Sequence, residues 1–450
     1  MLWMSTTTGR TATTDMIFTG IVCALTGAGV FLSVLMKPEL SLGRLRLGTY
    51  WVVSLLGALL LLLSGAVPLS YVGRELVADS SVNPIKILLL FFSMTFLSVY
   101  LDEVGFFRYL ASVALRRAGG SQTVLFLVLY LTVSVLTVFT SNDIVILTFT
   151  PFICFFARRA GIDPVPYLIA EFVAANTWSL LFVIGNPTNI YLASSAGIGF
   201  VPYLRVMALP TCMAGAVSLG VLYLLFRRRL SLPMGGAEPA RERIADPQEL
   251  ELGVFHLAGA TLLLAVSSYL HFEMVWAAVG FALSLGVMTG LLFLHRHAKP
   301  VILLSAARRL PFELIPFVLS MFVLVLGMNY TGLTGALADA LVTEHPVWSI
   351  GVSSFLAANL INNIPMSVLF SSVMGSVQDP ALYRQGLFAA VVGSNIGAYL
   401  TPVGALAGVM WSSILRRFGV HFSFRKFLLY GAAVALPTLA AALAGLCIVL

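Results

Sequence analysis

Apolar residues fall in long blocks along this chain, and most blocks have the length of a membrane span. The uninterrupted blocks cover residues 16–36, 50–69, 84–101, 206–226, 254–270, 274–294, 311–330 and 427–449. A helix that crosses a bilayer core of roughly 30 Å needs about 20 apolar residues. The pattern therefore predicts an all-α polytopic membrane protein.

Four longer blocks are interrupted by polar residues, glycine or proline. Residues 123–156 and 347–377 each read as an interrupted hairpin, whereas 167–196 and 386–414 each read as a broken span. The interruptions are Thr140-Ser141-Asn142-Asp143, Asn362-Asn363-Ile364-Pro365, Gly185-Asn186-Pro187-Thr188-Asn189, and Asn395 with Thr401-Pro402-Val403-Gly404. Amphipathic stretches at 105–117 and 333–342 precede the two hairpins and are expected to be interfacial helices or plain connectors.

The two halves of the chain follow the same order of elements. Each contains three spans, an interrupted hairpin, a broken span and a final span, and residues 141–144 align with 361–364. Residues 175–176 and 184–185 align likewise with 394–395 and 403–404. We predict a first repeat at 1–229, a flexible cytoplasmic linker at 230–252 and a second repeat at 253–450.

Basic clusters orient these halves. Arginines cluster at the ends of the apolar blocks, at 116–117, 158–159, 227–229, 308–309 and 416–417, and such clusters mark cytoplasmic ends. All of them lie on one side only if each hairpin is re-entrant. The first repeat then begins outside and the second inside. Five transmembrane helices plus one re-entrant hairpin in each of two inverted repeats, with helices broken at mid-membrane, are typical of secondary transporters.

Composition excludes several other classes. The chain has 450 residues, of which 59% are hydrophobic and 10% charged, against roughly 25% charged in soluble proteins. Its net charge of +7 is explained by the basic loop ends rather than by nucleic acid. The four cysteines have no metal-ligand spacing, and neither a P-loop nor an HExxH motif occurs. We assign no metal site and no enzymatic activity, since the spans hold no Ser/His pair; an intramembrane enzyme is the disfavoured alternative.

The interruptions carry the candidate chemistry, because broken backbone inside a membrane must face protein or an aqueous cavity. The half-helices that begin at the hairpin tips favour an anion or a polar oxyacid. Carbonyl groups freed in the broken spans are suited to a hard cation such as Na+. We assign substrate binding to Ser141, Asn142, Asp143, Asn362, Asn363, Asn176 and Asn395. We assign ion coupling to Asp143, Gly185, Asn186, Thr188, Asn189, Thr401, Pro402 and Gly404.

Two acidic residues lie within the apolar blocks at these points. Asp143 is the one carboxylate in the four interruptions, and an acid at the bilayer centre is a functional candidate because burying it is costly. It can bind a proton or cation, cap the return half-helix, or do both. Glu171 follows Tyr167 by four residues and is a weaker candidate, with a place at the membrane interface as the alternative.

At these motifs the chain resembles the ion transporter superfamily, and within it the arsenite-efflux and sodium/proton antiporter permeases. The resemblance rests on Ser141-Asn142-Asp143, Thr148-Phe149-Thr150-Pro151, Gly185-Asn186-Pro187-Thr188-Asn189, Asn362-Asn363-Ile364-Pro365, Gly393-Ser394-Asn395-Ile396-Gly397 and Thr401-Pro402-Val403-Gly404. It covers nearly the whole chain. The family also includes related citrate and dicarboxylate transporters.

The sequence thus predicts an ion-coupled secondary transporter of a small anion or metalloid oxyacid, with arsenite or antimonite efflux as the leading substrate. The alternatives are sodium/proton exchange at Asp143 and sodium-coupled dicarboxylate or citrate transport. We expect a multi-pass protein of the bacterial inner membrane that needs no cofactor and uses Na+ or H+ as its coupling ion. A homodimer and a cytoplasmic ATPase subunit are left open as partners.

Overall fold

The computed structural model describes residues 10–36, 39–42, 45–78, 83–117, 119–234, 244–267, 270 and 272–450. The first half of the chain contains α1 (Arg10–Met36), β1 (Glu39–Leu42), β2 (Leu45–Gly48), α2 (Thr49–Leu63), α3 (Leu69–Val77), α4 (Pro84–Glu103), α5 (Phe106–Arg117), α6 (Gln122–Phe139), α7 (Asn142–Ala160), α8 (Val165–Trp178), the 3-10 helix η1 (Val183–Gly185), α9 (Pro187–Ser195) and α10 (Phe200–Leu230). The second contains α11 (Pro247–Ser267), α12 (Met274–His295), α13 (Val301–Arg308), α14 (Leu314–Tyr330), α15 (Leu333–Leu341), α16 (Pro346–Ile361), α17 (Asn363–Gly375), α18 (Pro380–Gly397), α19 (Leu406–Arg417) and α20 (Phe424–Val449).

The predicted multi-pass helical architecture is confirmed. Among the described residues, seven helices are long and apolar enough to cross a membrane by themselves, and α14 with α15 forms one further bent pair. The antiparallel hairpin of β1 and β2 and the short helices α3 and α13 were not expected from the sequence. Each follows or precedes a span and is too short to give a periodic signal of its own.

The predicted linker is shorter than 230–252. Helix α10 continues to Leu230, and α11 begins at Pro247, so the last six residues assigned to the linker are helical. Residues 235–243 lie outside the described part of the chain. A proline at the first helical position is favourable because its missing N–H needs no partner there, which explains why the charged end of the linker starts a helix.

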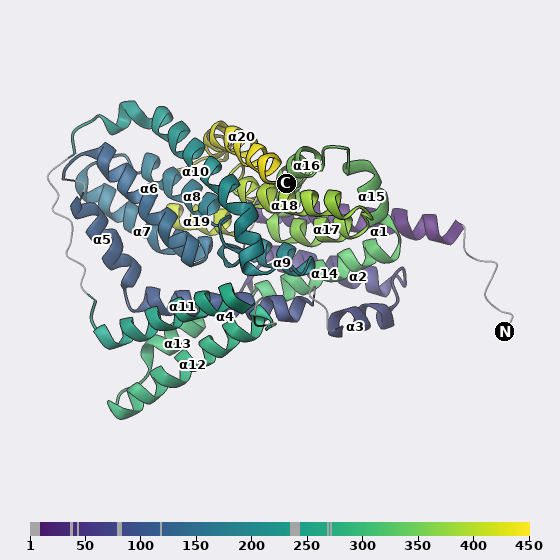
Figure 1. Ribbon diagram of the computed structural model, residues 1–450, viewed down its shortest axis with the longest axis horizontal. Helices are drawn as coiled ribbons and strands as arrows, with labels where there is room; N and C mark the ends of the chain where they lie inside the picture. The colour runs from purple at the N-terminus through teal and green to yellow at the C-terminus, as the bar shows by residue number, and fades with distance from the viewer. Residues whose placement is uncertain are drawn as a thin grey trace.

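Helix contacts divide the structure into two packed groups, and Figure 1 shows α11, α12 and α13 together with α4 along one edge. One group, here called the span bundle, contains α1, α2 and α4 from the first half and α11, α12 and α14 from the second, which contact one another. The other, here called the hairpin bundle, contains the pairs α6–α7 and α16–α17, the broken spans, α10 and α20. Corresponding helices make corresponding contacts: α6 packs on α8 as α16 packs on α18, and α12 packs on α4 as α2 packs on α14. These paired contacts are those that the predicted duplication of the two halves requires.

Local chemistry explains where the helices break. Asn362 joins α16 to α17 with φ of +74° and ψ of +153°, a strained backbone conformation that residues other than glycine rarely adopt. Its side chain also accepts a hydrogen bond from the backbone N–H of Ile364 at 3.3 Å. In the first broken span, Asn186 caps α9 by accepting from the Thr188 N–H, and Pro187 takes the first helical position.

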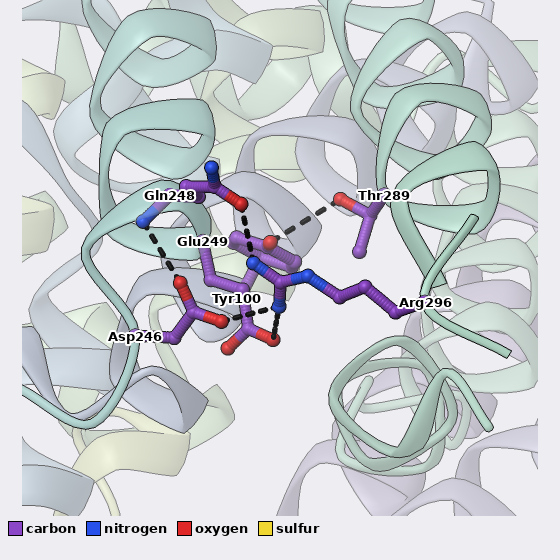
Figure 2. Close-up of polar contacts among 6 residues, drawn as sticks. All are labelled: Tyr100, Asp246, Gln248, Glu249, Thr289 and Arg296. Atoms are coloured by element: carbon purple, nitrogen blue, oxygen red, sulfur yellow. Dashed lines mark hydrogen bonds and ion pairs between the residues drawn. The ribbon is translucent and has the colours of Figure 1, made fainter. Parts of the chain in front are cut away.

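A polar network fixes the linker end of α11 to α12 (Figure 2). The Arg296 guanidinium, just after α12, donates to the Asp246 carboxylate and to the Gln248 side-chain oxygen, and it lies 3.7 Å from Glu249. Nearby, the Thr289 hydroxyl donates to the Tyr100 hydroxyl of α4 at 3.2 Å. The hydrogen bond from Arg296 lowers the pKa of Asp246 below its ordinary value.

This lowered pKa predicts a pH-dependent effect of Arg296→Gln. Because folding lowers the pKa of Asp246, the stabilisation is present above the ordinary value of 3.8 and is lost as the pH falls through the folded-state value. The variant should melt at a lower temperature than the parent at neutral pH, and the difference should shrink below pH of about 3.8. Arg229→Gln, which breaks a more exposed pair with Asp163, is the control and should have a smaller effect. An unchanged melting temperature for Arg296→Gln across this range would contradict the assignment.

Candidate functional site

The first hairpin tip is bonded to the first broken span. Thr140 is extended, Ser141 occupies the N-cap position of α7, and Asn142 begins the helix. The side-chain amide of Asn142 donates to the Asn176 side-chain oxygen at 2.9 Å, and Asn176 donates in turn to the Phe172 carbonyl at 2.8 Å. The structure therefore brings together two residues predicted to bind substrate.

Asp143 lies in the first turn of α7, one residue beyond the helix start. It does not cap the helix, because the N-cap position belongs to Ser141. Within the part of the chain that the structure describes, its carboxylate makes no hydrogen bond and no ion pair. The helix N-terminus favours a negative charge at this point, so Asp143 is a carboxylate with free acceptor capacity at the hairpin tip.

Asn395 of α18 joins the two broken spans. Its side-chain oxygen accepts from the Ser179 hydroxyl and from the Asn186 amide, both at 2.9 Å. Its amide donates to the Asn189 side-chain oxygen at 2.6 Å, and the neighbouring Ser394 donates to the Thr188 hydroxyl at 2.6 Å. All these residues are buried. The predicted substrate residue Asn395 and three predicted coupling residues thus form one hydrogen-bonded crossing between the halves.

The second hairpin tip is bonded to the second broken span. Asn362 donates from its amide to the Val403 carbonyl at 3.0 Å, and the Asn363 backbone N–H donates to the Gly404 carbonyl at 3.0 Å. Asn359, which the sequence analysis did not select, accepts from both the N–H and the hydroxyl of Thr401, at 3.0 and 2.8 Å. Asn359 lies one helical turn before Asn362 and Asn363, and this spacing could have identified it from the sequence.

Two of the predicted cation ligands in the second broken span are hydrogen-bonded to protein groups in this conformation. The Gly404 carbonyl accepts from Asn363, and the Thr401 hydroxyl donates to Asn359. Gly185 is required for close packing, since a Cβ there would collide with the Ser179 carbonyl. Pro402 is half-buried in the same loop as Thr401. The structure brings these ligand candidates together in two groups, one in each broken span.

Two small cavities are both lined by Phe91 of α4. One is lined by Thr95, Ser98, Thr140 and Ser141 together with Phe91, Met94, Ile184 and Ile190, and the other reaches Pro187 and Ile364 at the second hairpin. The Thr95 hydroxyl is buried without a hydrogen-bond partner among the described residues. No lysine or arginine lines either cavity within the described ranges.

The sequence analysis missed this polar face of α4. Thr95, Ser98 and Asp102 follow one another at spacings of three and four residues, which place them on one face of a helix. Asp102 accepts from the Thr148 hydroxyl of α7 at 2.8 Å and pairs with Arg309 at 2.7 Å. That spacing inside an otherwise apolar span was the signal from which the sequence analysis could have found the face.

Glu171 is buried and does not reach the interface, so that alternative is wrong. It is 1% exposed, and Tyr167, from which the interfacial position was inferred, is also 1% exposed. The Thr150 hydroxyl of α7 donates to its carboxylate at 2.9 Å. In the sequence, Glu171 lies close to the start of an apolar block, which suggested the interface. In the structure, α8 packs against α6, α7 and α10, and these helices enclose Glu171.

The crossing at Asn395 predicts a large effect of its removal. Asn395→Ala leaves Ser179, Asn186 and Asn189 buried with lost partners, and the free energy of unfolding should fall by roughly 3 kcal/mol. Thr211→Ala is the matched control: its buried hydroxyl bonds to the Met207 carbonyl of its own helix, so the loss should be about 1 kcal/mol. Thermal and denaturant melts of the detergent-purified variants measure both, and equal losses would contradict the role given to Asn395.

Comparison with known proteins agrees with this architecture. A citrate transporter (CitMHS) family model matches residues 45–385. The arsenical pump membrane protein of Escherichia coli K12 is 26% identical over 368 residues, covering 79% of this chain and 84% of that protein. A 46 kDa membrane protein of Mycobacterium leprae is 27% identical over 375 residues, with coverage of 79% and 84%. The YdaH transporter of Alcanivorax borkumensis has a similar fold, with a TM-score of 0.52 and 14% identity over 96% of this chain and 98% of that one.

These similarities confirm the resemblance to the ion transporter superfamily permeases and the assignment as a transporter rather than an enzyme. The apolar helices agree with a multi-pass protein of a bacterial membrane. The chain therefore belongs to the citrate transporter (CitMHS) family of membrane transport proteins.

Proposed function

We propose that this protein is an ion-coupled secondary transporter that moves a small, weakly charged oxyacid, with arsenite or antimonite efflux as the leading activity. The similarity to arsenical pump membrane proteins supports this substrate class. The sites would be the hairpin tips and the face of α4 that borders them. The substrate would bind between the tips and be exposed to the two sides in turn.

The observation that carries the proposal is the chemistry of the cavity wall at the first hairpin tip. Thr95, Ser98, Thr140 and Ser141 line this cavity together with four apolar side chains, and Asn142 and Asp143 follow directly in the chain. Hydroxyl groups both donate and accept hydrogen bonds, so this wall matches an uncharged trihydroxy species such as arsenous acid. A multiply charged anion such as citrate would need cationic or metal partners when buried, which disfavours citrate despite the family name.

Sodium/proton exchange is the second candidate, and the environment of Asp143 favours it. The Asp143 carboxylate is held at the hairpin tip without a hydrogen bond or ion pair among the described residues, so its acceptor oxygens are available to Na+ or H+. Oxygen ligands are those that Na+ requires, and a single titrating carboxylate is sufficient to exchange the two ions. Such exchange needs no substrate contact from Thr95 or Ser98.

Alternating access would use the two hairpins, which the basic clusters predict to lie on opposite sides of the membrane. In the first half, the third span, α4, contacts the return helix α7 through the hydrogen bond between Asp102 and Thr148. In the second half, the third span, α14, contacts the return helix α17 through the hydrogen bond between Asn329 and Ser372 at 3.2 Å. In the proposed inverted arrangement these contacts lie at opposite faces. Breaking one while the other holds would open one side at a time.

Flux measurements on the purified chain in liposomes test the proposed function. Arsenite should move under an imposed pH or Na+ gradient, whereas citrate should move much more slowly. Transport by the chain alone also tests whether an ATPase subunit is needed. Asn142→Ala and Asn363→Ala should each reduce arsenite flux by about tenfold or more, since a lost polar contact of 1.4 kcal/mol corresponds to a factor of ten. Thr211→Ala should transport normally; citrate flux that exceeds arsenite flux would overturn the substrate assignment.

Asp143→Asn tests the coupling role of the carboxylate. The substitution keeps the size of the side chain and removes its charge and titration. We expect this variant to lose gradient-driven accumulation and to retain arsenite exchange across a membrane without a gradient, because exchange requires no net movement of the coupling ion. Paired assays in the same vesicles measure both. Intact accumulation would exclude Asp143 as the coupling residue and would favour Na+ bound at the broken spans.

A further inference from the structure

The hairpin bundle contains a second carboxylate, Glu171, which is buried, whereas Asp143 is partly exposed. Glu171 is 1% exposed in the middle of α8. Its two oxygens lie 2.9 and 3.1 Å from the Thr150 hydroxyl of α7. The indole N–H of Trp411 of α19 faces the same carboxylate without completing a hydrogen bond, and Trp411 is itself 1% exposed.

The remaining surroundings of Glu171 are apolar. The neighbouring Phe172 ring lies 5.2 Å from the Trp411 ring and 5.6 Å from the Phe427 ring, measured between centroids. Cys154, one turn after Thr150 on α7, is the one titratable side chain on a neighbouring helix that interacts electrostatically with the carboxylate among the described residues. Asp143 lies on the same helix, about 10 Å from Thr150 along the axis.

No cation from a neighbouring helix compensates a charge on Glu171 within the described residues. Helix α6 contains no charged residue, and every arginine and lysine on the other helices around it is exposed: Arg158, Arg159, Arg205, Arg227, Arg228, Arg229, Arg384, Arg416, Arg417, Arg425 and Lys426. The tyrosine hydroxyls of α6, α8 and α10 donate to other groups. Tyr130 donates to the Gly215 carbonyl, Tyr203 to the Leu180 carbonyl, and Tyr167 to the Gln122 side-chain oxygen.

An ionised carboxylate in such a place is strongly disfavoured. Burying an unpaired charge costs several kcal/mol or more, and a single hydroxyl donor offsets a small part of that cost. A protonated carboxyl group is consistent with the observed contacts, because one of its oxygens still accepts from Thr150. The contacts and burial of Glu171 therefore favour its neutral form in this conformation.

We propose that Glu171 is a proton-binding site of the transport cycle, which releases its proton when α7 and α19 separate and water enters. Its hydrogen bond links it to the hairpin: Thr150, its donor, belongs to α7, the helix whose first turn carries Asp143. Movement of the hairpin tip on substrate binding would move Thr150 and change the solvation of Glu171. The role in the cycle rests on the proposed function, whereas the protonation itself does not.

Infrared spectroscopy of the purified protein in lipid tests the protonation without any substrate. The parent should show the carbonyl stretch of a buried protonated carboxyl group at neutral pH, and Glu171→Gln should remove it. Asp143→Asn is the matched control and should retain the band. Thr150→Val should keep the band but shift it, since the hydrogen bond to the carbonyl is lost, and it serves if Glu171→Gln does not fold. A parent without the band, or a band that persists in Glu171→Gln, would overturn the proposal.

Transport assays then test the role in coupling. A pH gradient of one unit drives about tenfold accumulation when one proton moves with each substrate. Glu171→Gln should abolish this accumulation while arsenite exchange without a gradient continues. If Glu171→Gln accumulates arsenite as the parent does, the coupling role is refuted although the proposed function stands. If the parent moves no arsenite at all, the proposed function fails, and the infrared result still decides whether Glu171 holds a proton.

Discussion

Buried amide side chains that satisfy one another at the crossing of the two broken spans are the constraint on which the rest of the site depends. Asn395 contacts Ser179, Asn186 and Asn189 across the two halves of the chain. Inside a membrane protein an unsatisfied amide has no water to bond, so each of these groups fixes the position of the next. The breaks can therefore exist at this depth only as a pair, and the hairpin tips are attached to them.

Three carboxylates in the hairpin region and α4 have three different environments, and the difference suggests a division of roles. Asp102 is paired with Arg309 and bonded to Thr148, which makes it a structural contact between the bundles. Asp143 has free acceptor capacity at a helix start. Glu171 is enclosed by aromatic rings with one hydroxyl donor. A carboxylate whose charge is compensated by an arginine, such as Asp102, is assigned a structural role. The two carboxylates without a cationic partner among the described residues, Asp143 and Glu171, are the candidates for ion coupling.

Membership of the family does not by itself decide the substrate of this protein. The family is named for citrate transport, and arsenical pump proteins are among the similar chains. Both activities can use the same backbone breaks, because helix starts and freed carbonyls bind polar groups of many kinds. In the proposed function the side chains on α4 and at the tips set the charge preference, and Thr95, Ser98 and Ser141 supply hydroxyl groups there.

The sequence alone determined the membrane class, the helical spans, the duplicated order of elements and the residues at the four breaks, because span length, helix punctuation and motif spacing are local properties. It did not determine which break contacts which, since Asn395 and Asn186 are distant in the chain and no periodicity links them. The spacing of the polar residues on α4 is present in the sequence, but only the packing of α7 against α4 shows that this face borders the hairpin. Glu171 was misplaced for the same reason: burial depends on the helices that pack around a residue, and only the tertiary structure shows them.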